Sequence, residues 1–210
     1  RVEILINFLR ASSYTSAVFS GIVFALNWRS AFDFAALRAH LKRGGVIAYP
    51  TESCYGLGCD PRHRAAVQKI LHLKHRPWHK GLILAVANLQ QITRFILPVS
   101  AAEGATLEQH WPGPHTFLLP ASSRAPKLLT GKHKSLAVRI SAHPEVARLT
   151  RALGPLVSTS ANVSGAKPIK TYAEAQRAFG QQVWVLPGRI GKRRAPSVII
   201  DLQSGKKLRG

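Results

Sequence analysis

The amino-acid sequence predicts an α/β protein: one domain in which helices flank a twisted sheet of parallel and antiparallel strands. Short apolar runs typical of strands alternate with amphipathic helical stretches from about residue 29 onward. Two strand-like runs, 116–119 and 136–140, follow each other without a helical pattern between them, which indicates that the sheet is mixed. A chain of 210 residues, 46% of them apolar, suits one domain with a sizeable core.

The first half of this domain is expected to alternate helices with buried strands. Ser30 and Asp33 have the spacing of a capping box, and an apolar stripe at helical spacing runs from there to Leu41. Gly44 and Gly45 end this helix. The next expected elements are a strand over 45–50, a helix over 64–75, a strand over 82–86, a helix over 89–96 capped by Asn88, and a helix over about 101–111.

The second half contains more strands. A polar, basic loop over 122–134 separates the strands at 116–119 and 136–140, and is interpreted as a lid or a tRNA contact. The remaining expected elements are a helix over 145–153 with Pro144 at its first position, a strand over 156–158, a helix that begins at the capping box of Thr171 and Glu174 and ends at Gly180, and strands over 183–186 and 198–202.

Residues 1–28 do not fit the pattern of the domain. Arg1 and Arg10 precede an apolar stretch over 17–26, as in a signal peptide, but this stretch is too short to span a bilayer and no clean small-x-small cleavage site follows it. We therefore expect 1–28 to be a leader or a mis-set start, with an interfacial helix as the alternative, and 29–210 to be the folded domain. No stable membrane association is expected.

The charge of the chain indicates a partner that is a polyanion. Thirty Lys and Arg residues stand against nine Asp and Glu, which gives a formal net charge of +21. Because the basic residues are spread along the sequence, the charge is expected on the folded surface and in a groove or cavity within it, the alternative being a surface that is merely solubilising. The only cysteines, Cys54 and Cys59, are interpreted as reduced thiols, which favours a cytoplasmic setting.

Three polar segments, 49–58, 73–83 and 158–165, lie near the ends of predicted strands, where α/β sheets place ligands. In the second, Lys74 and Arg76 can together clamp a polyanion such as a triphosphate. The third offers hydroxyl, amide and backbone N–H groups to phosphate and ribose oxygens. Taken singly, each segment could equally be a solvated helix end or a Ser or Asx turn.

Several classes of site are not supported by the sequence. The chain has neither the phosphate-binding pattern G-x-x-x-x-G-K-[ST] nor the nucleophile pattern G-x-S-x-G, and its few carboxylates disfavour paired-carboxylate hydrolysis. His72, His75 and His79 have spacings that could suit a metal site, but Pro77 interrupts the helix between the last two. They are interpreted as surface residues or phosphate contacts, and no metal site is predicted.

Seven short motifs follow one another along the chain: Ala48–Glu52, Leu73–Pro77, Lys80–Leu84, Trp111–Thr116, Leu136–Arg139, Ser158–Asn162 and Pro196–Ser197. In this order they resemble the YrdC-like, or threonylcarbamoyl-AMP synthase, family, in its short single-domain bacterial form. The resemblance covers about residues 30–210, and the segment 188–196 departs from it by its crowding of basic residues.

The resemblance implies a YrdC-like catalytic domain over 29–210 with a basic cavity in a mixed sheet. The implied enzyme is a nucleotidyltransferase, L-threonylcarbamoyladenylate synthase, which condenses L-threonine, bicarbonate or CO2, and ATP to threonylcarbamoyl-AMP and pyrophosphate, for the threonylcarbamoyladenosine modification of tRNA. Mg²⁺ is expected on the phosphates of ATP, with no prosthetic group. The implied partners are the threonylcarbamoyl transferase proteins of the same pathway, and tRNA or double-stranded RNA.

The same resemblance implies roles for single residues. Lys74 and Arg76 would bind the triphosphate and act in catalysis by electrostatic stabilisation. No base for the threonine amine is evident apart from Glu52, which could instead pair with a lysine. The nucleotide would also contact Thr116, Ser158, Ser160, Asn162 and Ser164, and threonine would contact Thr51, Arg139 and Ser197.

Two further functions are weighed against this one. A non-catalytic RNA-binding module could use the basic groove, with Tyr55, Trp78 and Trp111 as platforms for base stacking. Such a module would explain the charge, but not why Thr51, Arg139 and the run from residue 158 lie at separate strand ends. A carbamoyl-transfer domain like that of hydrogenase maturation proteins resembles this fold, but normally belongs to a much longer chain.

Overall fold

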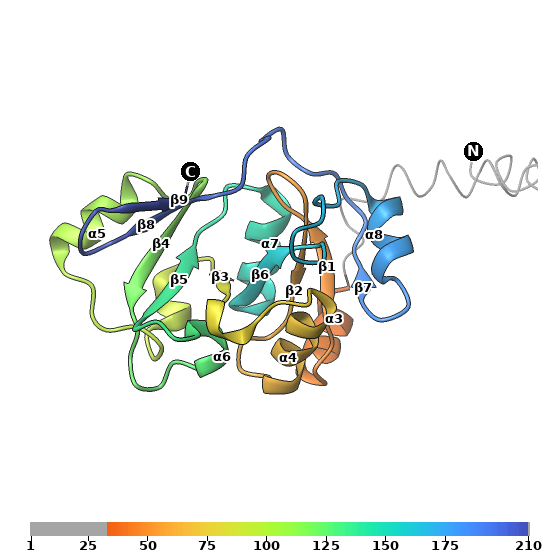
Figure 1. The fold of residues 1–210 in the computed structure, drawn as a ribbon, viewed down its shortest axis with the longest axis horizontal. Helices are drawn as coiled ribbons and strands as arrows, with labels where there is room; N and C mark the ends of the chain where they lie inside the picture. The colour runs from red at the N-terminus through yellow and green to blue at the C-terminus, as the bar shows by residue number, and fades with distance from the viewer. Residues whose placement is uncertain (1–32, 210) are drawn as a thin grey trace, which may run out of the picture. The chain divides into compact units, whose positions relative to one another are not determined.

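The computed structural model describes residues 33–209, whose strands form one nine-stranded sheet in the order β7-β1-β2-β6-β3-β5-β4-β8-β9 (Figure 1). The strands are β1 (Ile47–Pro50), β2 (Tyr55–Gly58), β3 (Ile83–Ala85), β4 (His115–Pro120), β5 (Ser135–Arg139), β6 (Leu156–Ser160), β7 (Trp184–Val185), β8 (Val198–Asp201) and β9 (Lys207–Arg209). The α-helices are α3 (Phe34–Lys42), α4 (Arg64–Leu73), α5 (Ala101–Glu108), α6 (Lys127–Thr130), α7 (Pro144–Leu153) and α8 (Tyr172–Phe179), and two 3₁₀ helices are η2 (Trp78–Lys80) and η3 (Leu89–Ile92).

The sheet is mixed, as the sequence predicts. The parallel pairs are β1 with β7, β3 with β5, and β4 with β8, and the other neighbouring strands run antiparallel. The expected neighbours β4 and β5 are an antiparallel pair, with Phe117 opposite Val138. The prediction of an α/β fold with a mixed sheet is confirmed.

Local chemistry explains where the helices begin. Thr171 and Glu174 form the predicted capping box of α8, and Pro144 occupies the first turn of α7, where its missing N–H loses no hydrogen bond. Ser100 and Glu103 form another capping box, at α5, which we did not predict. The cap proposed at Ser30 and the leader proposed for 1–28 lie outside the described residues.

Two of the predicted elements are wrong and two strands were missed. The helix expected over 89–96 is only the 3₁₀ turn η3, and the side chain of Asn88 makes no capping hydrogen bond. The loop 122–134 contains α6. Strand β2 was interpreted only as a polar motif, because its two glycines interrupt the apolar pattern of a strand. Strand β9 was missed because three residues are too few to show a strand pattern.

The loop 122–134 is also held more firmly than a free lid would be. The backbone N–H of Leu82 donates to the carbonyl of Leu129 at 2.8 Å, and that of Lys132 donates to His79 at 3.0 Å. A Cβ atom added at Gly131 would lie 2.2 Å from the carbonyl oxygen of His79, so only glycine permits this close approach. These bonds tie the loop to the segment around η2. No helix in the described part of the chain is long and apolar enough to span a membrane.

Candidate active site

A cavity of about 610 Å³ lies over one face of the central strands β3, β5 and β6. Side chains alternate between the two faces of a strand, and this alternation separates core from cavity. Leu84, Val138 and Val157 are fully buried in the core, whereas Ala137 and Ser158 line the cavity. The small and polar residues on that face leave the room for a ligand, so the site occupies a sheet face and not only the strand ends that we predicted.

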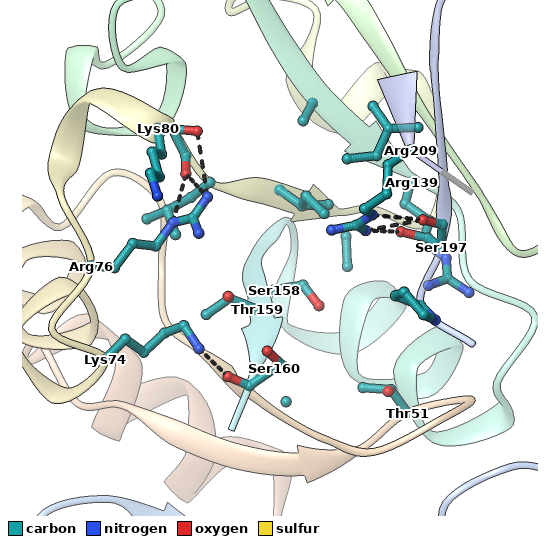
Figure 2. Close-up of a pocket in the computed structure, with 18 of the residues that line it drawn as sticks. Thr51, Lys74, Arg76, Lys80, Arg139, Ser158, Thr159, Ser160, Ser197 and Arg209 are labelled. Atoms are coloured by element: carbon teal, nitrogen blue, oxygen red, sulfur yellow. Dashed lines mark hydrogen bonds between the residues drawn. The ribbon is translucent and has the colours of Figure 1, made fainter. Parts of the chain in front are cut away.

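The cavity has two ends with different chemistry (Figure 2). Lys74, Arg76 and Lys80 lie toward one end, and Arg139 lies toward the other. The β6 residues around Ser158 lie between them. A volume of this size is typical of sites for small molecules and cofactors.

Lys74 is the most buried cation of the site, with 2% of its surface exposed. Its Nζ donates to the backbone carbonyls of Ser160 and Asn162, the latter at 2.8 Å, and to Oδ1 of Asn162 at 3.4 Å. Burial, and then the charge of Arg76, lower the pKa of Lys74 to about 8. Lys74 therefore fixes the 160–162 segment as well as bringing a positive charge to the cavity, whereas we predicted only the charge.

A strained turn separates Lys74 from Arg76. Helix α4 ends in a Schellman motif, in which Arg76 N donates to Leu71 O at 2.9 Å and His75 N donates to His72 O at 3.0 Å. The residue at the left-handed position is His75, with φ of +46°, where glycine is usual. This turn brings Arg76 to the cavity, where its Nε and Nη2 donate to the carbonyl of Gly81 at 3.2 and 3.0 Å.

The segment after β6 forms a turn that is closed by its own polar groups. Asn162 Nδ2 donates to the carbonyls of Val163 at 2.9 Å and Ala166 at 2.7 Å. Ser164 N donates to the carbonyl of Lys74 at 2.8 Å. Ser158, Ser160, Asn162 and Ser164 all line the cavity, so the structure brings the predicted nucleotide-contacting residues together around the end of α4.

The other end of the cavity contains an ion pair. Arg139 Nη2 lies 2.5 Å from Glu52 Oε1, and Ser141 Oγ donates to the same oxygen at 2.6 Å. The Nε of Arg139 donates to the carbonyl of Gly113 at 3.0 Å. Burial lowers the pKa of Arg139, and Glu52 opposes that shift. The sequence suggested a lysine as the partner of Glu52, and the structure shows that the partner is Arg139.

Thr51 begins the turn between β1 and β2, next to this ion pair. Its Oγ1 donates to the carbonyl of Cys54 at 2.7 Å, and its backbone N–H donates to the same oxygen at 3.0 Å. With its hydrogen used in this way, the hydroxyl can only accept a hydrogen bond from a ligand in the cavity. Cys54 and Cys59 are buried, free thiols.

The basic segment 188–196 runs along the turn at Thr51. Gly191 N donates to the carbonyl of Thr51 at 2.9 Å, and Arg193 N donates to that of Glu52 at 3.1 Å. A Cβ atom at Gly191 would lie 2.8 Å from the same Glu52 oxygen, so glycine permits this approach. His143, the residue just before α7, also holds this segment, through a hydrogen bond of 3.2 Å between its Nε2 and the carbonyl of Arg189.

Thr116, which we expected to contact the nucleotide, is not among the residues that line the cavity. Its side chain is fully buried, and its Oγ1 donates to Ser197 Oγ at 2.9 Å. Ser197 does line the cavity, so Thr116 lies one side chain behind it. Thr116 shares a face of β4 with Leu118, which lines the cavity, but Ser197 lies between Thr116 and the cavity.

Sequence reasoning missed several residues of the site. Arg209, on β9, lines the cavity, and its Nε and Nη2 donate to the carbonyl of Ser197 at 3.1 and 3.0 Å. Burial lowers the pKa of Arg76, and the charge of Arg209 lowers it further. Both guanidinium groups remain charged, and such repulsion between like charges is relieved by a bound anion. Lys80 and Ser141 also line the cavity. Lys80 belongs to one of the seven motifs, whereas Ser141 and Arg209 belong to none.

The described residues contain no group of three or more His, Cys, Asp or Glu side chains that could hold a metal ion. The one carboxylate among the residues that line the cavity, Glu52, is paired with Arg139. Mg²⁺ usually keeps several waters and binds through one or two carboxylates together with substrate phosphates. The cavity therefore fits Mg²⁺ only as a part of a phosphate substrate.

The three aromatic side chains predicted to stack on RNA bases, Tyr55, Trp78 and Trp111, do not form one exposed surface. Tyr55 is fully buried, and its hydroxyl donates to the carbonyls of Leu186 and Gly188. Trp111 is 9% exposed and packs edge-on against Phe117 in the core. Of the three aromatic side chains, only Trp78, which is 48% exposed, is available to a base.

The fold and the cavity define an α/β protein with a cavity lined by basic side chains on one face of a mixed sheet. The sequence model of the Sua5, YciO and YrdC proteins, described as "Telomere recombination", matches residues 39–209. The chain belongs to this family, which confirms the resemblance inferred from the motifs.

Individual relatives agree with this assignment. The threonylcarbamoyl-AMP synthase of Laribacter hongkongensis is 56% identical over 174 residues, which cover 83% of this chain and 94% of that protein. The crystal structure of P. abyssi Sua5 complexed with L-threonine is 27% identical with a TM-score of 0.75 over 83% of this chain, which spans only 52% of the Sua5 chain. E. coli YciO is 25% identical with a TM-score of 0.70, over 84% of this chain and 90% of that one.

Proposed function

We propose that this protein is an L-threonylcarbamoyladenylate synthase, which converts L-threonine, bicarbonate or CO2, and ATP to threonylcarbamoyl-AMP and pyrophosphate. The observation that carries the proposal is the convergence of three separate polar segments on one cavity with cations at one end and an Arg–Glu pair at the other. The name of the Laribacter relative, threonylcarbamoyl-AMP synthase, supports the activity, because this chain covers nearly all of that protein. The L-threonine in the Sua5 structure supports the amino acid substrate.

The two ends of the cavity suit the two substrates. We assign the triphosphate to Lys74, Arg76 and Lys80, and the nucleotide to the hydroxyl and amide groups that follow β6. L-Threonine is assigned to Thr51 and Arg139 at the other end, with Ser197 at its margin. Arg209 lies near enough to Arg76 to lower its pKa, so an anion that bridges the two ends would relieve their repulsion.

The chemistry places new negative charge between these ends. The neutral threonine amine adds to CO2 and loses a proton to water, which gives a carbamate. A carbamate oxygen then attacks the α-phosphorus of ATP as the bond to the β-phosphate oxygen breaks and pyrophosphate leaves. The cations hold the reactants in line and stabilise charge on the phosphoryl oxygens and the leaving pyrophosphate. Mg²⁺ is proposed to enter as MgATP, a substrate, because the described residues offer it no ligand cage.

The product is proposed to serve the threonylcarbamoyladenosine modification of tRNA, through the transferase proteins of that pathway. The two free, buried thiols support a reducing, cytoplasmic setting. Direct contact with tRNA or double-stranded RNA stays a prediction, supported by the net charge of +21 and by the exposed Trp78.

The test is pyrophosphate release from MgATP and bicarbonate, with and without L-threonine. Wild-type protein should release pyrophosphate only with L-threonine, and much less with L-serine or L-valine. Lys74→Ala and Arg76→Ala should each lower the rate by about 100-fold or more, because each removes a positive charge from the phosphates.

Two variants serve as matched controls. Lys69→Ala alters the same helix, where Lys69 Nζ donates to the carbonyl of Gln182 away from the cavity. Arg62→Ala removes an arginine that pairs with Asp60 at 2.7 Å. Both should keep wild-type rates. Wild-type protein that releases no pyrophosphate with or without L-threonine, but binds tRNA in a strongly salt-dependent way, would favour the non-catalytic RNA-binding module instead.

A further inference from the structure

Glu52 is an exception in the cavity. The described residues that line it include the cations Lys74, Arg76, Lys80, Arg139 and Arg209, and Glu52 is the only carboxylate among them. A carboxylate weakens the attraction of such a cavity for phosphates and carbonate. Its presence therefore needs a reason other than the binding of anions.

The contacts of the Glu52 carboxylate are one-sided. Arg139 Nη2 and Ser141 Oγ both contact Oε1, at 2.5 and 2.6 Å, and Oε2 accepts no hydrogen bond from the described residues. The backbone of Glu52 is fixed as well, since its carbonyl accepts from Arg193 N at 3.1 Å. The carboxylate is thus held in place by one oxygen and keeps the other for a ligand.

Arg139 has unused capacity on its side of the pair. Its Nη2 is buried in the ion pair with Glu52, whereas its Nη1 makes no hydrogen bond with the described residues. A free carboxylate in the cavity can therefore bind this guanidinium without displacing an established hydrogen bond, since the one at Nε goes to the carbonyl of Gly113. The result is one anionic and one cationic group side by side at the same end of the cavity.

This pair matches the charges of a free amino acid. An α-amino acid near neutral pH carries an ammonium group and a carboxylate on one carbon atom, and Glu52 and Arg139 carry the opposite charges. We propose that Glu52 binds the α-ammonium group of the amino acid substrate through Oε2, while Arg139 binds its α-carboxylate. The inference rests on the proposed function and adds a specificity-determining residue to it.

Thr51 extends the same arrangement. Because its hydroxyl hydrogen is held by Cys54 O, its oxygen accepts, and it lies next to Glu52 in the chain. Glu52 and Thr51 therefore both offer acceptors to an ammonium group, which has three donors. A ligand with a neutral hydroxyl in place of the ammonium group would keep the contact with Arg139 but lose its charge attraction to Glu52.

The test measures the affinities of two ligands by calorimetry, near neutral pH. One is L-threonine. The other is 2,3-dihydroxybutanoate of matching configuration, in which a hydroxyl replaces the ammonium group. In Glu52→Gln the affinity for L-threonine should fall by about tenfold or more, the loss typical of a charged hydrogen bond, while the affinity for dihydroxybutanoate should stay the same or rise.

A purely structural role for Glu52 predicts a different result. If Glu52 only holds Arg139 in place, Glu52→Gln weakens both ligands by the same factor, and that result overturns the proposal. No loss for either ligand overturns it too. Glu145→Gln is the matched control, because Glu145 is a buried glutamate that pairs with Arg148 at 3.3 Å and does not line the cavity; it should change neither affinity.

If thermal unfolding shows that Glu52→Gln does not fold, the wild-type protein alone still tests the proposal. The wild type should bind L-threonine at least about tenfold more tightly than dihydroxybutanoate, and equal affinities overturn the proposal. Wild-type protein that binds neither ligand and shows no threonine-dependent pyrophosphate release contradicts the proposed function itself. Threonine-dependent release, with no preference for the ammonium group, contradicts the inference about Glu52 alone.

Discussion

At the scale of single residues, Lys74 shows how burial gives a cation two tasks. Its Nζ donates to carbonyl oxygens of the 160–162 segment and also faces the cavity. Burial disfavours the charged form, so its pKa falls from 10.5 to about 8. Around pH 8 the charge of Lys74 therefore depends on what else is bound.

This pKa predicts a proton linkage to ATP binding. The phosphates favour the charged ammonium, so they should raise the pKa of Lys74 above 8, and ATP binding at about pH 8.5 should take up a fraction of a proton. The affinity for ATP should accordingly fall as the pH rises through 8. Calorimetry in buffers of different ionisation enthalpy measures the uptake. Lys74→Arg, which stays charged, should abolish it, and the same uptake in that variant would assign the proton to another group.

At the scale of elements, the end of α4 is a strained turn beside the site. The left-handed φ of His75 is unfavourable for a residue with a Cβ atom by about 1–2 kcal/mol, and the Schellman hydrogen bonds of Arg76 and His75 hold it. The strain lies directly between the two predicted phosphate-binding cations. It fixes the direction in which Arg76 leaves the helix.

Glycine at the left-handed position of this turn should raise the free energy of unfolding, whereas glycine within the helix before it should lower that free energy. His75→Gly should raise the free energy of unfolding by about 0.5–1 kcal/mol, because glycine adopts the left-handed region without strain, even after its greater freedom in the unfolded chain is counted. His72→Gly, at a helical position of α4, should instead lower it by about the same amount. Urea denaturation measures both, and a loss of stability in His75→Gly would show that the His75 side chain contributes contacts that outweigh the strain.

At the scale of the whole molecule, the charge is strongly unbalanced, with 30 basic against nine acidic residues. Repulsion among like charges destabilises a folded protein and is screened by salt. In the cavity the same imbalance is concentrated, since five cations and one carboxylate line it. Anions should therefore stabilise the protein both by general screening and by binding there.

The charge predicts that thermal stability rises with ionic strength. Raising sodium chloride from about 0.05 to about 0.5 M should increase the melting temperature by on the order of 3 °C, because the Debye length shrinks well below the spacing of most surface charges. Calorimetry or circular dichroism measures the shift. Glycerol at equal osmolality, which does not screen charge, serves as the control, and a melting temperature that falls with salt would contradict the prediction.

Much of the site could be predicted because the motifs are short and local. Lys74, Arg76 and the run from Ser158 were chosen for the chemistry of their side chains, and Arg139 for its place in a family motif. The structure places them around one cavity. Their roles in binding stay predictions. Thr116 was misplaced because its motif does not show that Ser197, 81 residues away, covers it, and Arg209 was missed because β9 is three residues long.

The sequence by itself determined the class of fold, the family and the chemical character of the site, because these depend on periodicity, capping residues and ordered motifs that lie within a few residues of one another. Only the tertiary structure decided which faces the strands turn to the cavity, that Glu52 pairs with Arg139, and that Tyr55 and Trp111 belong to the core. Those contacts join residues far apart in the chain, such as Glu52 with Ser141 and Arg139. The order of the strands and the packing across the sheet set them, and a local pattern does not show which distant strands lie side by side.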